Sequence, residues 1–178
     1  LKEDDEHIWV KSGAGENWHA FVLHCIAQGW AGVENLSLIP GCVGASPMQN
    51  IGAYGVELKD VFDELEAYSI NDQKIIFFPK NDCQFGYRES VFKNELKEQY
   101  IITAVLFQLT KKNHAVSTTY GAIETELSKQ NIQNPTLKDV SNAVIAIRKS
   151  KLPDPKELGN SGSFFKNPVL LKIDFESE

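Results

Sequence analysis

The chain has 178 residues, of which 42% are apolar and 24% charged, as is usual for a globular chain of one domain or slightly more. Its formal net charge of −6 argues against general nucleic-acid binding, and no apolar run approaches the roughly 20 residues that span a bilayer. The three cysteines are irregularly spaced and form no Cys-x-x-Cys pair, which favours buried thiols over disulfides or a zinc site. Because the chain starts at Leu1 and stops at Glu178 just after an apolar run, we expect an internal piece of a longer protein.

The first third of the chain predicts a strand, a helix and a long irregular loop. Residues 7–11 alternate weakly and predict a strand, and residues 17–28 carry apolar side chains at helical spacing that end at Gly29. Residues 31–57 hold five glycines and two prolines, too many for a regular element, while their apolar side chains argue against disorder. An ordered loop of this length is usually functional.

Four further elements are expected, namely strands over 61–70, 75–78 and 100–109 and a helix over 136–148. The pattern of the first of these fits a helix or a strand, and the turn residues that follow it favour the strand. Thr136 and Asp139 resemble a capping box at the start of the helix, and Leu152-Pro153 stops it. Strands followed by a helix, without regular βαβ alternation, predict an α+β fold.

The glycines of the long loop permit two interpretations. The candidate ligand-binding positions are Gly41, Gly44, Gly52 and Gly55, with Ser46 and Asn50 as side-chain partners. Successive backbone N–H groups form a nest for a pyrophosphate, although the spacing fits neither a Rossmann nor a Walker loop. A structural loop, whose glycines satisfy unusual backbone angles, is an equally good interpretation.

Two isolated positions also carry candidate functional side chains. Arg88, which follows Gly-Tyr, is placed either for a bidentate pair with a carboxylate or phosphate or for a surface salt bridge to Glu89 or Glu95. Tyr120 lies in a polar stretch, which forms either a mobile flap with the phenol at its tip or a loop that the tyrosine anchors on the core. The histidines have no spacing that suggests a metal site.

The last segment is basic in an acidic chain. Residues 148–167 hold five lysine or arginine residues and two aspartate or glutamate residues. The local charge of +3 indicates a solvated face or a site for an anion. The neighbouring glycine, proline and asparagine residues favour the anion site. Ser163 stands between a glycine and two phenylalanines, where a ligand can meet bare backbone away from water. A serine is a poor acid, so Ser163 needs a donor network with Lys151 or Lys166 as candidates.

Five stretches read together resemble one known family. They are GAGENWHAFV (13–22), IPGCVGASPMQNIGAYGVE (39–57), FGYRESVFK (85–93), TYG (119–121) and RKSKLPDPKELGNSGSFFKNP (148–168). In this order they resemble the UDP-N-acetylenolpyruvoylglucosamine reductase, or MurB, family over almost the whole chain. Tyr120 is similar to a tyrosine of the family's type I branch. In that branch a loop that carries the tyrosine folds over the substrate.

This resemblance implies a cytoplasmic flavoenzyme of peptidoglycan precursor synthesis. In the family, NADPH reduces a tightly bound FAD, and the flavin passes a hydride to UDP-GlcNAc-enolpyruvate to give UDP-N-acetylmuramate. The implied protein is a monomer without nucleic-acid or membrane partners. A non-catalytic module that binds a nucleotide sugar on the same fold is the alternative, and a flavin oxidase acting on an alcohol is a weaker one.

The resemblance also assigns roles to residues. Ser163 would protonate the intermediate, and Arg88 would bind the enolpyruvyl carboxylate and stabilise developing charge. The substrate-binding residues would be Tyr120, Lys151 and Asn167. The FAD-binding residues would be Gly41, Gly44, Ser46, Asn50, Gly52, Tyr54 and Arg148, with no metal. Ala45 departs from the pattern, because many relatives carry a second serine there.

The family architecture implies two regions. Residues 1–147 would form the second subdomain of a two-part FAD-binding domain of the PCMH or vanillyl-alcohol-oxidase type. Residues 148–178 would begin an α+β substrate-binding domain. The first FAD-binding segment would precede Leu1 and a catalytic glutamate would follow Glu178, so we expect this piece alone to be inactive.

Overall fold

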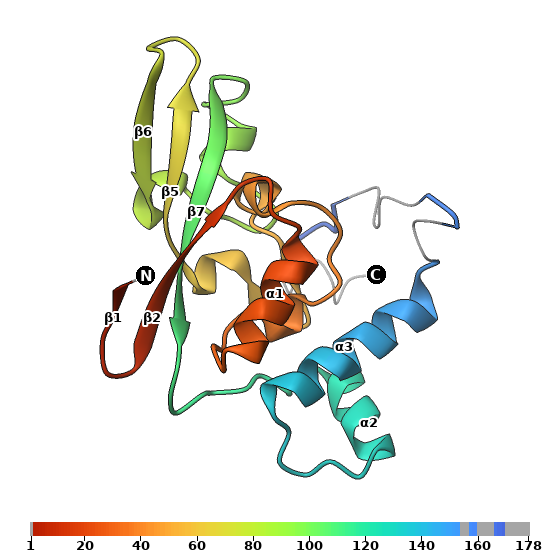
Figure 1. Ribbon diagram of the computed structural model, residues 1–178. Coiled ribbons are helices and arrows are strands. Elements are labelled where there is room, and N and C mark those ends of the chain that lie inside the picture. Colours follow the sequence, from red (N-terminus) through yellow and green to blue (C-terminus); the bar gives the residue numbers. More distant parts are fainter. Residues whose placement is uncertain (1, 154–156, 160–165, 170–178) are drawn as a thin grey trace.

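A five-stranded antiparallel sheet in the order β1-β2-β7-β5-β6 forms the body of the protein (Figure 1). Its strands are β1 (Lys2–Glu3), β2 (His7–Gly13), β5 (Phe62–Ser69), β6 (Lys74–Pro79) and β7 (Tyr100–Thr110). The long strand β7 lies at the centre because it pairs with both β2 and β5. The structure, a computed structural model, describes residues 2–153, 157–159 and 166–169.

The described residues form the helices α1 (Trp18–Ala27), α2 (Gly121–Lys129) and α3 (Leu137–Lys151). The side chain of Asn17 caps α1 by accepting the N–H of Ala20 at 3.0 Å. Thr136 and Asp139 form the predicted capping box at the start of α3. This helix ends at the residue before Leu152-Pro153, as the restriction that proline places on its predecessor requires.

The predicted strands and the two predicted helices are confirmed within a few residues, and so is the α+β class. The helix α2 is not among the predicted elements, and it begins directly after Tyr120, for which the sequence predicts a flap or an anchored loop. Ile123 and Leu127 stand four residues apart and are buried against α3, so tertiary packing stabilises a segment with a weak helical pattern.

The main core lies between one face of the sheet and α1 with the loop that follows it. Along β2 the buried residues alternate, with Ile8 and Val10 pointing to the core. Phe21 of α1 packs on Phe107 of β7 with ring centroids 4.7 Å apart, and Trp18 lies beside both rings. This aromatic contact fixes α1 across the sheet.

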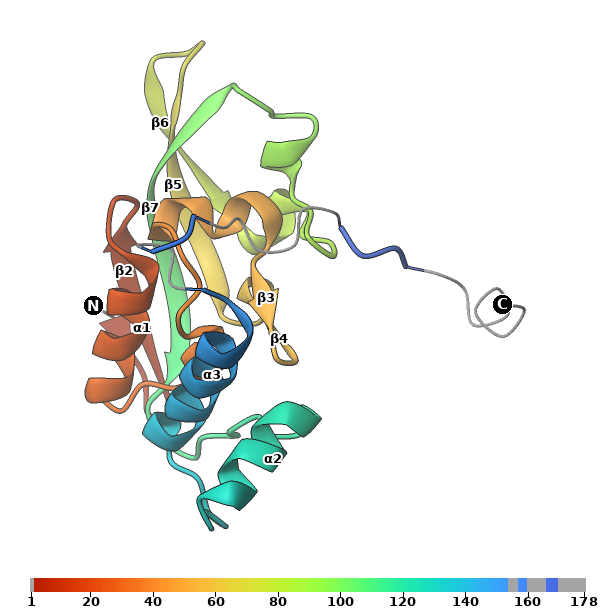
Figure 2. The same cartoon turned by 90° about the vertical axis from the view of Figure 1, so that its right-hand side faces the viewer.

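A second, smaller core joins α2 to α3, which lie side by side in Figures 1 and 2. Two hydrogen bonds tie α3 to the loop after α1. The Oγ atoms of Ser141 and Ser37 are 2.7 Å apart, and Arg148 Nε donates to the carbonyl of Leu38 at 3.1 Å. None of the helices in the described ranges is both long and apolar enough to cross a bilayer.

The long loop is ordered as short turns followed by a small hairpin. The turns are the 3-10 segments Glu34–Leu36, Val43–Ala45 and Pro47–Gln49, with further ones at Leu58–Asp60, Lys80–Cys83 and Val91–Lys93. The hairpin consists of β3 (Gly52–Ala53) and β4 (Val56–Glu57), and it points toward α2 and α3 (Figure 2). The predicted irregular loop is therefore confirmed, and it connects the sheet to the helix pair.

Candidate functional site

The glycine-rich loop uses its N–H groups within the chain at residues 43–46. The N–H groups of Val43, Gly44, Ala45 and Ser46 donate to the carbonyls of Glu16, Ala14, Cys42 and Val43 at 2.9–3.0 Å. Engaged donors of this kind do not form an open nest for a pyrophosphate. At this turn the structural interpretation of the glycines is the better supported one.

Close packing explains two of the small residues in this turn. A Cβ atom on Gly44 would lie 2.5 Å from the Cβ of Ala14, so only glycine lets the loop approach the end of β2. Ser46 is buried, and its Oγ donates to the carbonyl of Val43 at 2.6 Å. Gly41 is exposed, and no atom of the described residues outside its neighbours lies within 4 Å of an added Cβ. Gly41 therefore borders space that a ligand can enter.

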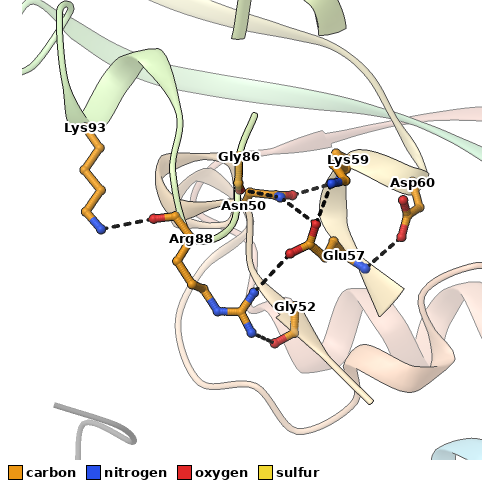
Figure 3. Close-up of polar contacts among 8 residues, drawn as sticks. All are labelled: Asn50, Gly52, Glu57, Lys59, Asp60, Gly86, Arg88 and Lys93. Carbon is orange, nitrogen blue, oxygen red and sulfur yellow. Dashed lines mark hydrogen bonds and ion pairs between the residues drawn. The ribbon is translucent and has the colours of Figure 1, made fainter. Parts of the chain in front are cut away.

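Asn50 is fully buried at the centre of a polar cluster (Figure 3). Its Oδ1 accepts the N–H of Lys59 at 2.9 Å, and its Nδ2 donates to the Gly86 carbonyl at 3.0 Å and to Glu57 at 3.2 Å. Both polar groups of the Asn50 side chain therefore have hydrogen-bond partners. Through them Asn50 links the residues before β3 to β4 and to the turn that carries Arg88.

Arg88 lies on a tight turn with a left-handed backbone, at φ 56°. The residues flanking the turn, Gly86 and Glu89, exchange both of their backbone hydrogen bonds at 3.1 and 3.2 Å. The hydroxyl of buried Ser90 then donates to the carbonyl of Met48 at 2.7 Å. These bonds fasten the arginine turn to the glycine-rich loop.

The guanidinium of Arg88 points to the base of the hairpin (Figure 3). Its Nη2 donates to the Gly52 carbonyl, its Nη1 lies 3.5 Å from Glu57 Oε1, and its carbon lies 4.9 Å from the centre of the Tyr87 ring. The partner is thus Glu57 and not Glu89 or Glu95. A guanidinium has five N–H donors, so others are left for a carboxylate or phosphate.

The tip of the hairpin brings two candidate residues together. Tyr54 and Gly55 form its two-residue turn, both with left-handed backbones. The Tyr54 ring meets Tyr120 edge to face, with centroids 5.4 Å apart, just before α2 begins. Burial raises the pKa of Tyr54, while the nearby Arg148 acts in the opposite direction. The tip is therefore an aromatic pair beside a cation.

Arg148 lies near the aromatic tip of the hairpin and also binds the backbone of Leu38. Leu38 has a left-handed backbone, at φ 59°, and its carbonyl accepts a hydrogen bond from Arg148 Nε at 3.1 Å. The N–H of Leu38 donates to His19 Nδ1 at 3.0 Å, so this nitrogen is unprotonated. Burial lowers the pKa of His19, and the charges of Arg148 and Lys149 lower it further.

Lys166, from the stretch 148–168 of the family resemblance, contacts the arginine turn of residues 86–89. Lys166 Nζ is 2.8 Å from Glu89 Oε1 and 5.8 Å from the centre of the Tyr87 ring, and this lysine lowers the pKa of Glu89. Asn167 and Lys151 are exposed. Ser163 lies outside the described residues.

Two polar residues in these clusters, the partly buried Glu57 and the buried Asn35, were not singled out from the sequence. Glu57 pairs with Arg88, and Asn35 donates to the carbonyls of Tyr54 and Ser117, each at 3.0 Å. Asn35 Oδ1 is buried and has no hydrogen-bond partner among the described residues. The partners lie 19 to 82 residues apart, so local sequence carried no signal for them.

Curated relatives and a solved structure match nearly the whole chain, and a family model matches its first part. Residues 1–76 match a family model described as an FAD binding domain. The chain is 64% identical over 176 residues to the UDP-N-acetylenolpyruvoylglucosamine reductase of Flavobacterium johnsoniae, covering 99% of this chain and 52% of that relative. The reductase of Amoebophilus asiaticus is 54% identical over 170 residues, covering 96% and 50%. The crystal structure of the MurB reductase from Thermus caldophilus matches with a TM-score of 0.64 at 24% identity, covering 90% and 48%.

The fold and the family model together define an α+β FAD-binding domain, one that spans about half the length of the relatives it matches. FAD is thus the cofactor for which this class of domain is built. The chain belongs to the UDP-N-acetylenolpyruvoylglucosamine reductase, or MurB, family, as the motifs predicted. The roles of single residues and the boundary at residue 147 stay predictions.

Proposed function

We propose that the full-length protein is an FAD-dependent reductase that uses NADPH to convert UDP-GlcNAc-enolpyruvate to UDP-N-acetylmuramate for peptidoglycan synthesis. The observation that carries this proposal is the 64% identity of 99% of the chain to a relative named for that activity. The names of the relatives give no support to the non-catalytic alternative. In this proposal the protein acts in the cytoplasm as a monomer, on a small-molecule substrate.

The residues at the hairpin fit a flavin nucleotide in part. Gly41 borders open space, and Arg148 supplies a cation beside Tyr54. We expect these three residues to contact FAD and expect Gly44, Ser46, Asn50 and Gly52 to shape the loop behind it. FAD supplies the hydride chemistry when bound, and the protein positions the reactants. The proposed FAD-binding part is 1–147, and 148–178 would begin the substrate domain.

The substrate would lie between the arginine turn and the stretch 148–168. Arg88 would bind the enolpyruvyl carboxylate and stabilise negative charge as it develops. Ser163 would deliver the proton, and the contact of Lys166 with Glu89 supports a motif that reaches this turn. Tyr120, Lys151 and Asn167 would contact the sugar nucleotide and its phosphates.

The decisive experiment is an absorbance spectrum of the full-length protein during one reaction cycle. We expect a flavin band near ~450 nm that bleaches with NADPH and returns with UDP-GlcNAc-enolpyruvate. A protein that stays colourless after FAD is added would support the binding module instead.

A serine variant tests the proton donor. In the full-length enzyme, Ser163→Ala should keep the bleaching by NADPH and lose the return of the band with substrate. Ser128→Ala is a matched control, because Ser128 is exposed on α2. Wild-type turnover in Ser163→Ala would remove the serine from the mechanism.

A further inference from the structure

Glu57 lies between two cations, Lys59 and Arg88 (Figure 3). Its Oε2 is 2.8 Å from Lys59 Nζ and 3.2 Å from Asn50 Nδ2, whereas its Oε1 is left to face Arg88 Nη1 at 3.5 Å. Lys59 and Asn50 therefore orient the carboxylate, and one oxygen is directed at the guanidinium. We propose that Glu57 is a positioning residue, which holds the Arg88 guanidinium in the orientation that binds the substrate carboxylate.

The guanidinium is fixed from three sides. The Gly52 carbonyl accepts from Nη2, Glu57 faces Nη1, and the Tyr87 ring lies beneath its carbon. A Cβ atom on Gly52 would be 2.7 Å from Nη1, so the glycine is what lets the side chain lie against β3. A long side chain held in this way loses less freedom when a ligand arrives.

This arrangement has a distinct electrostatic consequence. A carboxylate beside Arg88 opposes the attraction of an anionic substrate, so Glu57 does not serve tight binding as such. It serves geometry, because a donor aimed in advance at developing charge needs no reorganisation during the reaction. Loss of the Glu57 charge should therefore lower kcat without raising KM, a division that general loss of structure would not produce.

The test uses variants of the full-length flavoprotein, and it rests on the proposed function. In Glu57→Gln we expect kcat to fall about 10- to 100-fold, as a small misplacement of a catalytic group does, with KM unchanged or lower. Bleaching of the flavin by NADPH should be unaffected. Glu66→Gln is the control, since Glu66 of β5 forms an ion pair with Lys11 of β2 at 2.7 Å, on the main sheet and not in the hairpin, and it should match the wild type.

A double variant separates positioning from an independent role. Because Glu57 acts through Arg88, Glu57→Gln combined with Arg88→Ala should be no slower than Arg88→Ala alone. Full additivity of the two losses would overturn the inference, as would a Glu57→Gln enzyme with wild-type kcat.

Gly52→Ala tests the same geometry without changing charge, and it serves if Glu57→Gln fails to fold. Its backbone angle is not left-handed, so alanine can adopt it, and the added Cβ would displace the guanidinium, which it approaches most closely at 2.7 Å. The same Cβ would lie 3.0 Å from Glu57 Cγ and 3.1 Å from the Val56 carbonyl, so the hairpin must also give slightly. We expect the same fall in kcat, and an unchanged kcat would contradict the inference. A wild-type protein without a flavin cycle would instead refute the proposed function, so the two failures are distinguishable.

Discussion

The two ends of the β3–β4 hairpin are held in different ways. At its base, Asn50 is fully buried, and Glu57 and Arg88 have several polar partners each within the chain. At its tip, the Tyr54 ring meets Tyr120 through one edge-to-face contact, the Tyr54 carbonyl accepts from Asn35 at 3.0 Å, and half of the Tyr120 surface is exposed. The base is thus defined by the protein itself, while the tip presents aromatic surface to the outside.

This difference indicates which end can adapt to a ligand. Buried hydrogen bonds make a cluster costly to rearrange, because each separated donor or acceptor is left without a partner. Separating two partly exposed rings costs little free energy. Segments that rearrange around ligands are usually those of low local stability. We expect the base to aim Arg88 and the tip to adjust around a bound nucleotide.

Removal of the Arg88 side chain should have the largest effect on turnover. In the full-length enzyme, Arg88→Ala should lower kcat/KM for the enolpyruvyl substrate by about 10²- to 10³-fold, the usual cost of one donor to developing charge. Steady-state kinetics measure this loss. Lys111→Met removes a cation paired with Glu3 at the sheet edge, at 2.9 Å, and should change little. An Arg88→Ala enzyme within a factor of two of wild type would show that the base has no part in turnover.

Removal of Asn50 tests how firmly the base is locked. Asn50→Ala leaves the N–H of Lys59 without its partner and removes one of the two hydrogen bonds to the Gly86 carbonyl, so the free energy of unfolding should fall by about 1–3 kcal/mol. Urea unfolding of the full-length protein measures it. Asn142→Ala, at an exposed helical position of α3, should cause no loss. Equal stability of the two variants would contradict the rigid base.

The tip should show a smaller effect, measured as a coupling between its two rings. A double-mutant cycle of Tyr54→Ala and Tyr120→Ala should give about 0.5–1.5 kcal/mol, the usual value for an aromatic pair. Unfolding free energies of the four proteins supply the cycle. A coupling as large as the Asn50 effect would mean that both ends are equally locked.

Much of the fold follows from local patterns, whereas the polar clusters do not. The alternation along 7–11, the helical stripe of 17–28 and the capping box at Thr136 each depend on a few neighbouring residues, so they are legible in one sequence. The helix α2 was missed because its burial against α3 decides its structure.

The site divides in the same way. Arg88, Tyr120 and the glycines of the long loop stand out by residue type and surroundings, and the motif resemblance singled out Tyr54. Their partners depend on folding, since Glu57 meets Arg88 across 31 positions and Asn35 meets Ser117 across 82. A sequence can thus indicate which side chains carry chemistry before it can indicate which ones hold them in place.

The smallest expected effect is a pH dependence of stability that arises from His19, which is linked to Arg148 at the tip through the backbone of Leu38. His19 accepts the N–H of Leu38, whose carbonyl binds Arg148, and burial keeps the pKa of His19 below its ordinary 6.5. As the pH falls through 6.5, the unfolded chain therefore takes up this proton first, and folding loses stability. We expect a decrease of about 1 kcal/mol or less between pH 7 and pH 5 in the unfolding free energy of the full-length protein.

His19→Asn isolates this contribution, because an amide oxygen can accept the same N–H without titrating. The variant should lose part of the stability change between pH 7 and pH 5, while His24→Asn, at an exposed position of the same helix, should keep the wild-type profile. Identical profiles for His19→Asn and the wild type would show that His19 does not link pH to the tip. A smaller change in unfolding free energy between pH 7 and pH 5 for His19→Asn would show that the contact of His19 with Leu38, next to Arg148, weakens on protonation. That result would agree with a tip that is less firmly held than the base.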